Sequence, residues 1–287
     1  MDKFFEYLLN IDRKVIFLLI ALSTTVPLFI TVKQDIKPDN AAIKFYKTLD
    51  NLKAKINRGE DAVVLISAEY GPGTIPELSP MAKAAFKQLL DMDAKIIIMG
   101  LYPMGPPLMM AEFNKLIKLP KYINKKYGVD YVNLGYTAGN AIVIKGMVKS
   151  IIGKYPIDVN GTSLKDIPLM QKVKNFDDID VVIDFSSMGG AAKPWIQFAK
   201  KTTDESMKIL SGCTAVIAPE SYPYLNSGQL QGLLGGLKGA ADYEKLIETP
   251  DNGTKYIFAQ SVAHIVIMLF ILIGNIAFFV TRKKRVV

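Results

Sequence analysis

Side chains that could bind a small molecule gather in five segments, each of which follows an apolar run of the sequence. The segments cover residues 69–80, 102–107, 135–140, 186–194 and 220–228, and all are rich in Gly, Pro and Tyr. The candidate ligand-binding residues are Glu69, Tyr70, Tyr102, Tyr136, Asp184, Ser186, Glu220 and Tyr222. Alternatively, the glycines and prolines serve only the turns, and the tyrosines pack at a domain edge.

The same segments contain no arrangement of side chains that is typical of catalysis. His264 is the only histidine and lies inside a long apolar run, so Ser186 or Ser187 has no histidine to act as its base. A serine–lysine pair with Lys193 or Lys145 stays open, but no spacing favours it. We therefore predict that the protein has no catalytic residues and is not an enzyme.

The sequence also lacks the patterns that hold common cofactors and metals. Residues 71–76 half-resemble a dinucleotide fingerprint, but the third glycine and the acidic residue that would contact the ribose are missing. No G-x-x-x-x-G-K-[ST] phosphate-binding loop and no calcium-loop pattern occur. One cysteine and one histidine cannot supply a zinc site. We predict neither a cofactor nor a metal.

The glycine-rich stretch at residues 227–244 has the spacing of a helix. Its leucines recur three and four residues apart, which predicts one apolar face. Beside that face runs a stripe of small residues, which would let another backbone approach closely. The stripe consists of Gly228, Gly232, Gly235, Gly236, Gly239 and Ala240. Three readings stay open: packing within the domain, an interface with a second copy, or phosphate binding at the helix N-terminus near Ser227.

Apolar runs alternate with amphipathic segments between these motifs. Residues 62–68, 95–101, 130–134, 180–185 and 214–219 read as strands. Helical periodicity marks residues 80–92, 107–127, 141–152 and the segment around 193–201. Strands that are apolar on both faces and alternate with helices indicate a parallel sheet covered on both sides. We predict a three-layer, Rossmann-like α/β domain with a mostly parallel sheet of about five strands, which places the five segments at the carboxyl ends of the strands.

Two uncharged apolar runs predict transmembrane helices on either side of this domain. They cover residues 15–32 and 257–280, and crossing a bilayer takes about 20 apolar residues. The basic tail at residues 281–287 favours the cytoplasmic side. We therefore expect both termini in the cytoplasm, with residues 1–14 as a cytoplasmic or interfacial amphipathic segment and residues 33–256 as an extracytoplasmic domain.

The charge and the cysteine count narrow the expected partners. A formal net charge of +8 suits anionic lipid headgroups, and nucleic acid is not expected on the outer side of a membrane. A single cysteine, Cys213, excludes an intramolecular disulfide. The expected partners are the lipid bilayer, further copies of the chain and other membrane proteins.

Two stretches resemble a family of uncharacterised two-span membrane proteins of prokaryotes. They are YGVDYVNLGYTAG, residues 127–139, and GCTAVIAPESYPYLNSGQLQGLLGGLKGAADYE, residues 212–244. The resemblance implies an extracytoplasmic α/β domain held at the plasma (inner) membrane of a prokaryote. It implies no activity and no functional residue.

These observations favour a non-enzymatic, two-pass membrane protein whose outer domain self-associates. It would serve as a scaffold or as an accessory subunit of an envelope assembly. The alternative is a membrane-tethered domain that binds or senses a small molecule through the tyrosine-rich segments. A hydrolase ranks third.

Overall fold

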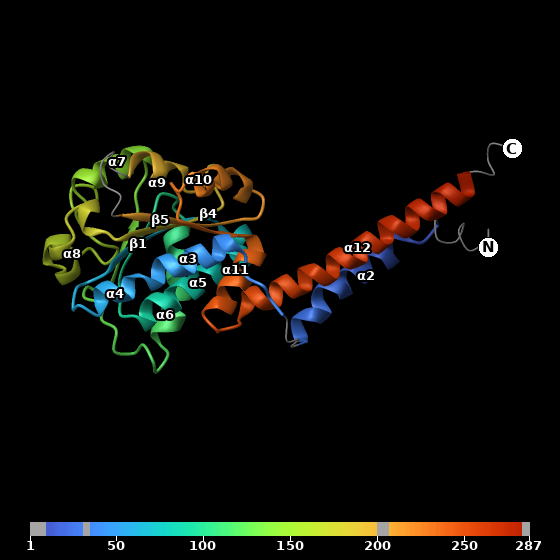
Figure 1. The fold of residues 1–287 in the computed structure, drawn as a ribbon, viewed down its shortest axis with the longest axis horizontal. Helices are drawn as coiled ribbons and strands as arrows, with labels where there is room; N and C mark the ends of the chain where they lie inside the picture. The colour runs from blue at the N-terminus through green and yellow to red at the C-terminus, as the bar shows by residue number, and fades with distance from the viewer. Residues whose placement is uncertain (1–9, 31–34, 200–206, 283–287) are drawn as a thin grey trace. The chain divides into compact units, whose positions relative to one another are not determined.

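The computed structural model describes residues 10–30, 35–199 and 207–282. The chain divides into two compact units. One is Ile36–Gly253, which we call the α/β domain, and the other combines Met1–Asp35 with Thr254–Val287. The α/β domain holds the sheet and the helices around it (Figure 1).

The domain is built on a six-stranded sheet in which every neighbouring pair is parallel. The strands are β1 (Val63–Glu69), β2 (Lys95–Gly100), β3 (Tyr131–Tyr136), β4 (Val181–Ser186), β5 (Lys208–Cys213) and β6 (Gly232–Gly235). Their order is β3-β2-β1-β4-β5-β6. The order reverses between β1 and β4, so the chain crosses there from one half of the sheet to the other. This is the Rossmann-like order, and the reversal is the place where such sheets bind ligands.

One face of the sheet is covered by α3 (Asn40–Asp50), α5 (Ile75–Asp91), α6 (Gly105–Ile117) and α11 (Gly236–Leu246), with α4 (Leu52–Ile56) after α3. These helices form where the sequence supplies start signals and an apolar stripe. Asp39 caps α3 by accepting from the Ala42 N–H at 2.7 Å, and a proline lies in the first turn of α5. Phe45, Phe86 and Phe113 of these helices are buried in the core.

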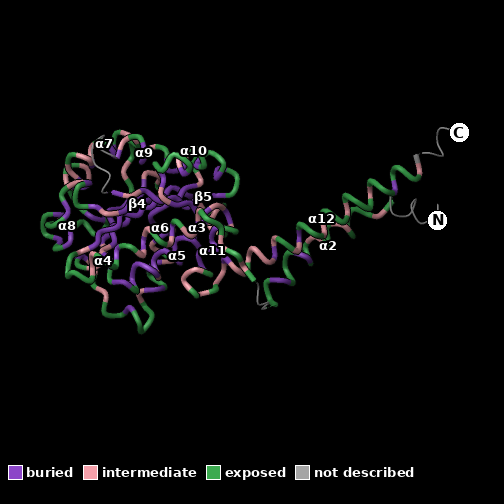
Figure 2. Tube along the Cα trace, viewed as in Figure 1, coloured by how far each residue is buried: buried purple, intermediate pink, exposed green. Residues whose placement is uncertain are grey.

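The opposite face is covered by shorter helices: α7 (Ala141–Lys149), α8 (Pro168–Lys172), α9 (Lys193–Phe198) and α10 (Tyr222–Asn226). The 3₁₀ turns of the described residues are η1 (Val26–Phe29), η2 (Pro72–Thr74), η3 (Leu164–Asp166), η4 (Phe176–Asp178) and η5 (Ala218–Ser221). Figure 2 shows buried chain running through the middle of the domain, with helices on both sides. The α/β architecture predicted from the sequence is therefore confirmed.

The prediction was wrong for the last two strands. The fifth strand is β5, Lys208–Cys213, whereas the predicted residues 214–219 form the turns that follow it. A sixth strand, β6, lies inside the stretch that was predicted as one helix at residues 227–244. Leu233 and Leu234 are buried on opposite faces of the sheet, as in a strand covered on both sides. A short apolar run of this kind cannot be distinguished from a helix by periodicity alone.

Glycine permits this arrangement at two points of the stretch. A Cβ at Gly232 would collide with the backbone of Phe45, so its absence lets α3 lie directly on β6. Gly236 has φ +57°, a left-handed conformation that side chains disfavour, and it begins α11 directly after the strand. The glycines thus serve a strand-to-helix junction and not a long helix.

The second unit contains one helix of the described residues that is long and apolar enough to cross a membrane. This helix is α12 (Asn252–Arg282), which includes the predicted span 257–280. The other predicted span, 15–32, is not one long helix. Its first part lies in α2 (Arg13–Thr25), which ends just before η1, the 3₁₀ turn that contains Pro27. The prediction of two transmembrane helices is corrected to one candidate. Residues 31–32 of that span, most of segment 1–14 and residues 283–287 of the tail lie outside the described residues.

Candidate functional site

Polar side chains replace apolar ones at the carboxyl ends of three neighbouring strands. The last residue and the third-last residue of β1, β4 and β5 are polar or cysteine. Strand register places them in two rows, and all six are buried. We call them the polar rows: Ser67, Asp184 and Ser211 in the first, and Glu69, Ser186 and Cys213 in the second.

The polar rows continue a line of apolar positions on the face covered by α7, α8, α9 and α10. Leu65, Val182 and Ile209 precede the rows by two residues in their strands and belong to the core on that face. Successive side chains of a strand alternate between faces. The rows therefore lie under the α7 and α9 side of the sheet, at its carboxyl edge.

Asp184 is the residue of the site whose burial costs the most folding free energy. Its side chain is fully buried, and within the described residues neither carboxylate oxygen has a hydrogen-bond partner of normal geometry. Burial and the neighbouring Glu69 raise the pKa of Asp184 well above its usual value, while the nearby Trp195 indole opposes the rise. The Ser211 hydroxyl in the same row also lacks a partner among those residues. A buried polar group without a partner costs about 1–3 kcal/mol.

Glu69 lies beside Asp184 and titrates near neutrality. Its Oε1 accepts from the Ser67 hydroxyl at 2.5 Å and from the Leu101 backbone N–H at 2.7 Å. Burial raises the pKa of Glu69 to about 7, although both hydrogen bonds act to lower it. A carboxyl group with such a pKa can give or take a proton at neutral pH. The carboxyl groups and hydroxyls of the rows offer hydrogen bonds and protons. Within the described residues no group of three or more side chains is arranged to hold a metal ion.

The polar rows lie at the reversal of strand order, because β1 and β4 carry Glu69, Asp184 and Ser186. The loop after β4 is fastened to the end of β1, since the Ser187 N–H donates to the Glu69 carbonyl at 3.1 Å. Further along this loop, the Gly190 N–H donates to Glu220 Oε2 at 2.7 Å. The end of β1 and the loops after β4 and β5 thus meet at one place.

The structure brings together some of the predicted ligand-binding residues and separates others. Glu69, Asp184 and Ser186 are neighbours in the polar rows, and Glu220 contacts the adjoining loop. Tyr102 lies against Gly71, in the loop after β1. Tyr70 is buried on the other face of the sheet, beside Ser79. Tyr136 and Tyr222 are 42% and 47% exposed, at the end of β3 and at the start of α10. The tyrosines among the candidate ligand-binding residues therefore do not gather around one place.

The predicted small-residue stripe is divided between two elements and lies largely inside the domain. Gly232 and Gly235 belong to β6, and Gly236, Gly239 and Ala240 belong to α11. A Cβ at Gly239 would collide with the Leu234 backbone, as one at Gly232 would with Phe45. Gly228 is exposed in the preceding turn. The close approaches that these glycines allow are thus to elements of the same domain.

Sequence analysis missed Ser67, Ser211, Cys213 and Trp195 as members of the site. A signal was present: the strands end in Ser-Ala-Glu, Asp-Phe-Ser and Ser-Gly-Cys, each with non-aliphatic residues two apart after an aliphatic run. Because residues two apart in a strand share a face, three such endings predict one polar surface. Trp195 has no comparable signal, since α9 alone brings it over the sheet.

Comparisons with known proteins give one distant structural likeness. No protein-family model matches the sequence, and no curated protein matches it. Among solved structures, the chain is similar to a trehalose-6-phosphate synthase, OtsA, with 12% identity and a TM-score of 0.33. The alignment covers 83% of this chain and 46% of the synthase, so the chain spans about half of that protein's length.

The prediction that the chain is not an enzyme is corrected, because it was based on the lack of a recognisable catalytic pattern, and such an absence excludes no activity. The solved structure to which the chain is similar is that of a synthase. At this identity and TM-score, the likeness assigns no activity, substrate or residue to the present chain.

Proposed function

We propose that the α/β domain binds a small polar molecule at the polar rows and that α12 tethers the domain to a membrane. The ligand presents hydroxyl or ammonium groups, because the rows offer carboxyl groups and hydroxyls as partners. One observation carries this proposal: Asp184 is a fully buried carboxyl group without a normal hydrogen bond, placed where the strand order reverses.

Packing gives no reason for an acid at this position. Valine or isoleucine would fit the pattern of the neighbouring core, since Val182 and Ile209 occupy the same face. An unpartnered carboxyl group lowers stability, and such costs are typical of positions that serve binding or chemistry. Ligands of open α/β sheets bind beyond the carboxyl ends of the strands at the reversal of strand order. The energetic cost and the topology therefore favour the same place.

The loop after β4 supports this assignment. Glu69 is 8% exposed, so the rows are close to solvent only at the edge of the sheet. The loop there contains Gly190 at φ +87° and Ala191 at φ +37°, and a left-handed alanine is a strained conformation. Strain of this kind is typical of binding loops.

The test is a thermal-shift screen of the full-length protein in mild detergent. The panel contains polyols, sugars, amino alcohols and amino acids, because these carry the proposed donors. We expect at least one compound to raise the melting temperature by several degrees. The shift should vanish in Asp184→Asn and persist in Asp166→Asn, which removes an exposed carboxylate elsewhere. A panel without any stabilising compound, or an equal shift in Asp184→Asn, would contradict the proposal.

Self-association of the domain stays a prediction. The residues on which it was based lie largely within the domain, so we propose no interface from them. Cytoplasmic termini, a prokaryotic plasma membrane and an accessory role in an envelope assembly likewise stay predictions. Light scattering of the full-length protein in detergent checks the oligomeric state directly.

A further inference from the structure

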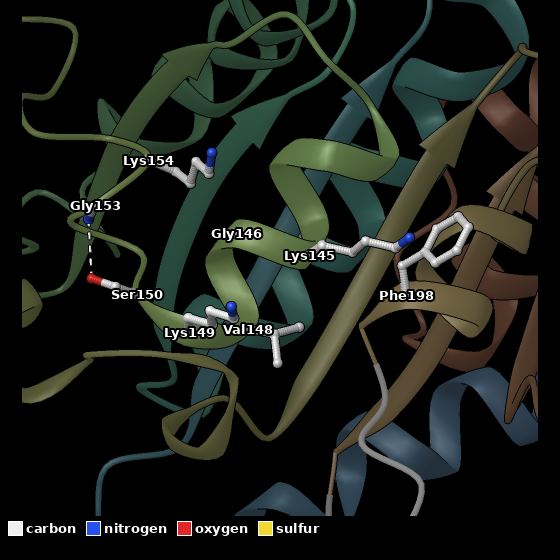
Figure 3. Close-up of a pocket in the computed structure, with 8 residues that line it drawn as sticks. All are labelled: Lys145, Gly146, Val148, Lys149, Ser150, Gly153, Lys154 and Phe198. Atoms are coloured by element: carbon white, nitrogen blue, oxygen red, sulfur yellow. Dashed lines mark hydrogen bonds between the residues drawn. The ribbon is translucent and has the colours of Figure 1, made fainter.

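A second candidate site lies on the outer side of α7, away from the polar rows. It is an open pocket of about 600 Å³, formed by α7, the turn that follows it and Phe198 at the end of α9. Figure 3 shows the side chains that line it. Lys145, Lys149 and Lys154 line this pocket, and no acidic side chain among the described residues does. We call it the basic pocket, and its volume falls in the range of about 300–1,000 Å³ that is usual for ligand sites.

The three lysines are not neutralised by the described part of the protein. No ion pair joins any of them to an acidic residue there. Other lysines of the domain do form such pairs, for example Lys95 with Asp130 at 2.8 Å. Ammonium groups that share a pocket repel one another. A bound anion would relieve this repulsion.

The backbone holds Lys154 over α7. A Cβ at Gly146 would overlap the alkyl chain of Lys154, so the glycine provides the space through which that chain passes. The turn before it is closed by the Gly153 N–H, which donates to the Ser150 hydroxyl at 3.0 Å. Lys154 is thus placed against the helix that carries the other two lysines, as the close-up shows (Figure 3).

An apolar wall completes the pocket. The Lys145 ammonium nitrogen lies 4.5 Å from the centroid of the Phe198 ring, which is a cation–π distance. Val148 lines the same space. Lys149 lies in the last turn of α7, where a cation stabilises the helix dipole. That role explains Lys149, but it does not explain why Lys154 crosses the helix at a glycine.

We propose that the basic pocket binds a phosphate-bearing anion. Its charged group lies in the positive field of Lys145, Lys149 and Lys154, and its apolar part covers Val148 and Phe198. Ammonium groups are common phosphate partners in proteins. The phosphate belongs either to a lipid headgroup or to a soluble molecule, and the two sources share this chemistry.

The experiment titrates inorganic pyrophosphate into the full-length protein by calorimetry. The protein is held in nanodiscs of phosphatidylcholine in one arm and of phosphatidylglycerol in the other. We expect saturable binding in the first arm that weakens as salt increases. Competition by phosphatidylglycerol would identify a lipid headgroup as the occupant, whereas unchanged affinity would identify a soluble phosphate. No saturable binding in either arm overturns the proposal.

Two variants locate the site. Lys145→Gln combined with Lys149→Gln and Lys154→Gln should weaken pyrophosphate binding by roughly tenfold or more. The control, Lys44→Gln with Lys118→Gln and Lys165→Gln, removes the same charge from exposed positions and should leave the affinity unchanged. Equal weakening in the control would show non-specific attraction and overturn the proposal.

A further variant changes no charge. Gly146→Ala forces Lys154 off the helix while improving helix propensity. We expect several-fold weaker pyrophosphate binding without a lower melting temperature. Unchanged affinity would show that the placement of Lys154 is irrelevant, and the proposed site would be wrong.

Discussion

The two faces of the sheet are equally buried at the carboxyl ends of β1, β4 and β5, yet they differ in chemistry. Ala68, Phe185 and Gly212 lie on the side of α5 and pack without polar groups. One residue away in each strand, the polar rows hold carboxyl, hydroxyl and thiol groups. Burial alone therefore does not explain the residue types. The apolar face stabilises the domain, and the polar face carries groups whose presence costs stability.

We expect the largest effect from a substitution on the apolar face. Phe185 is fully buried, and its ring lies over Gly212, where a Cβ would come within 2.5 Å of it. Phe185→Ala removes this ring and leaves a cavity, so we expect a loss of about 3–5 kcal/mol in the free energy of unfolding. Urea denaturation of the full-length protein measures it. A loss below about 1 kcal/mol would show that this face is not the stabilising one.

The second prediction concerns Glu69, whose replacement should raise the free energy of unfolding, whereas Phe185→Ala should lower it. The pKa of Glu69 is raised by burial from 4.5 to about 7, so the folded state binds more protons than the unfolded state between these values. Stability from this group is therefore complete below pH 4.5 and is lost as the pH rises to about 7. Glu69→Gln should remove this loss and stabilise the domain above pH 7 by on the order of 3 kcal/mol.

Urea titrations of wild type and Glu69→Gln at pH 5 and pH 8 check the sign. The two proteins should have similar free energies of unfolding at pH 5, and the variant should have the higher value at pH 8. Asp166→Asn, at an exposed site, should show no such dependence. A variant that is less stable than wild type at pH 8 would contradict the assignment.

A smaller effect is expected at Ser67. Its hydroxyl donates to Glu69 at 2.5 Å and lowers the pKa of that carboxyl group. Ser67→Ala removes the bond, so the pKa of Glu69 should rise above about 7, with a stability change of about 1 kcal/mol. Carbon-detected NMR titration of the glutamate carboxyl groups measures the pKa. An unchanged or lowered value would show that the hydrogen bond does not form.

The smallest effect concerns Cys213. Burial, with Asp184 nearby, raises the pKa of this thiol to about 12. The reactive thiolate is therefore scarce at pH 8. Iodoacetamide should label Cys213 slowly in the native protein and rapidly in urea. Rapid native labelling would mean that the second polar row is open to solvent.

Local sequence patterns predicted most of the sheet but not its last part. β1, β2, β3 and β4 coincide with predicted runs to within two residues. β1, β2 and β4 are aliphatic runs bounded by turn residues, and β3 is a short run with Tyr131, Val132 and Leu134. β5 has only Ile209 and Leu210 before Ser211 and Gly212, so its aliphatic run is short, while the following TAVIAP segment has a longer apolar run but forms turns. β6 is a strand because α3 and β5 enclose it, and that tertiary contact leaves no periodic signal.

The structure brings three of the predicted ligand-binding residues together and separates others. The rule that ligands bind beyond strand carboxyl ends selected Glu69, Asp184 and Ser186, which are neighbours in the sheet. It also selected Tyr70, which faces the other way, because a one-residue step along an extended chain changes the face. The register between strands, which places Ser67, Asp184 and Ser211 in a row, follows from the folded sheet and not from the order of residues.

The central claim is that the polar rows lower the stability of the domain and bind a ligand. The infrared spectrum of the Asp184 carboxyl group tests this claim most directly. The difference spectrum of wild type minus Asp184→Asn at pH 7 should contain the C=O stretching band of a protonated carboxyl group, because burial raises the pKa of Asp184 well above its usual value. That band should shift when a stabilising polyol or amine binds. A spectrum with only carboxylate bands, or a band that no stabilising compound moves, would contradict the account.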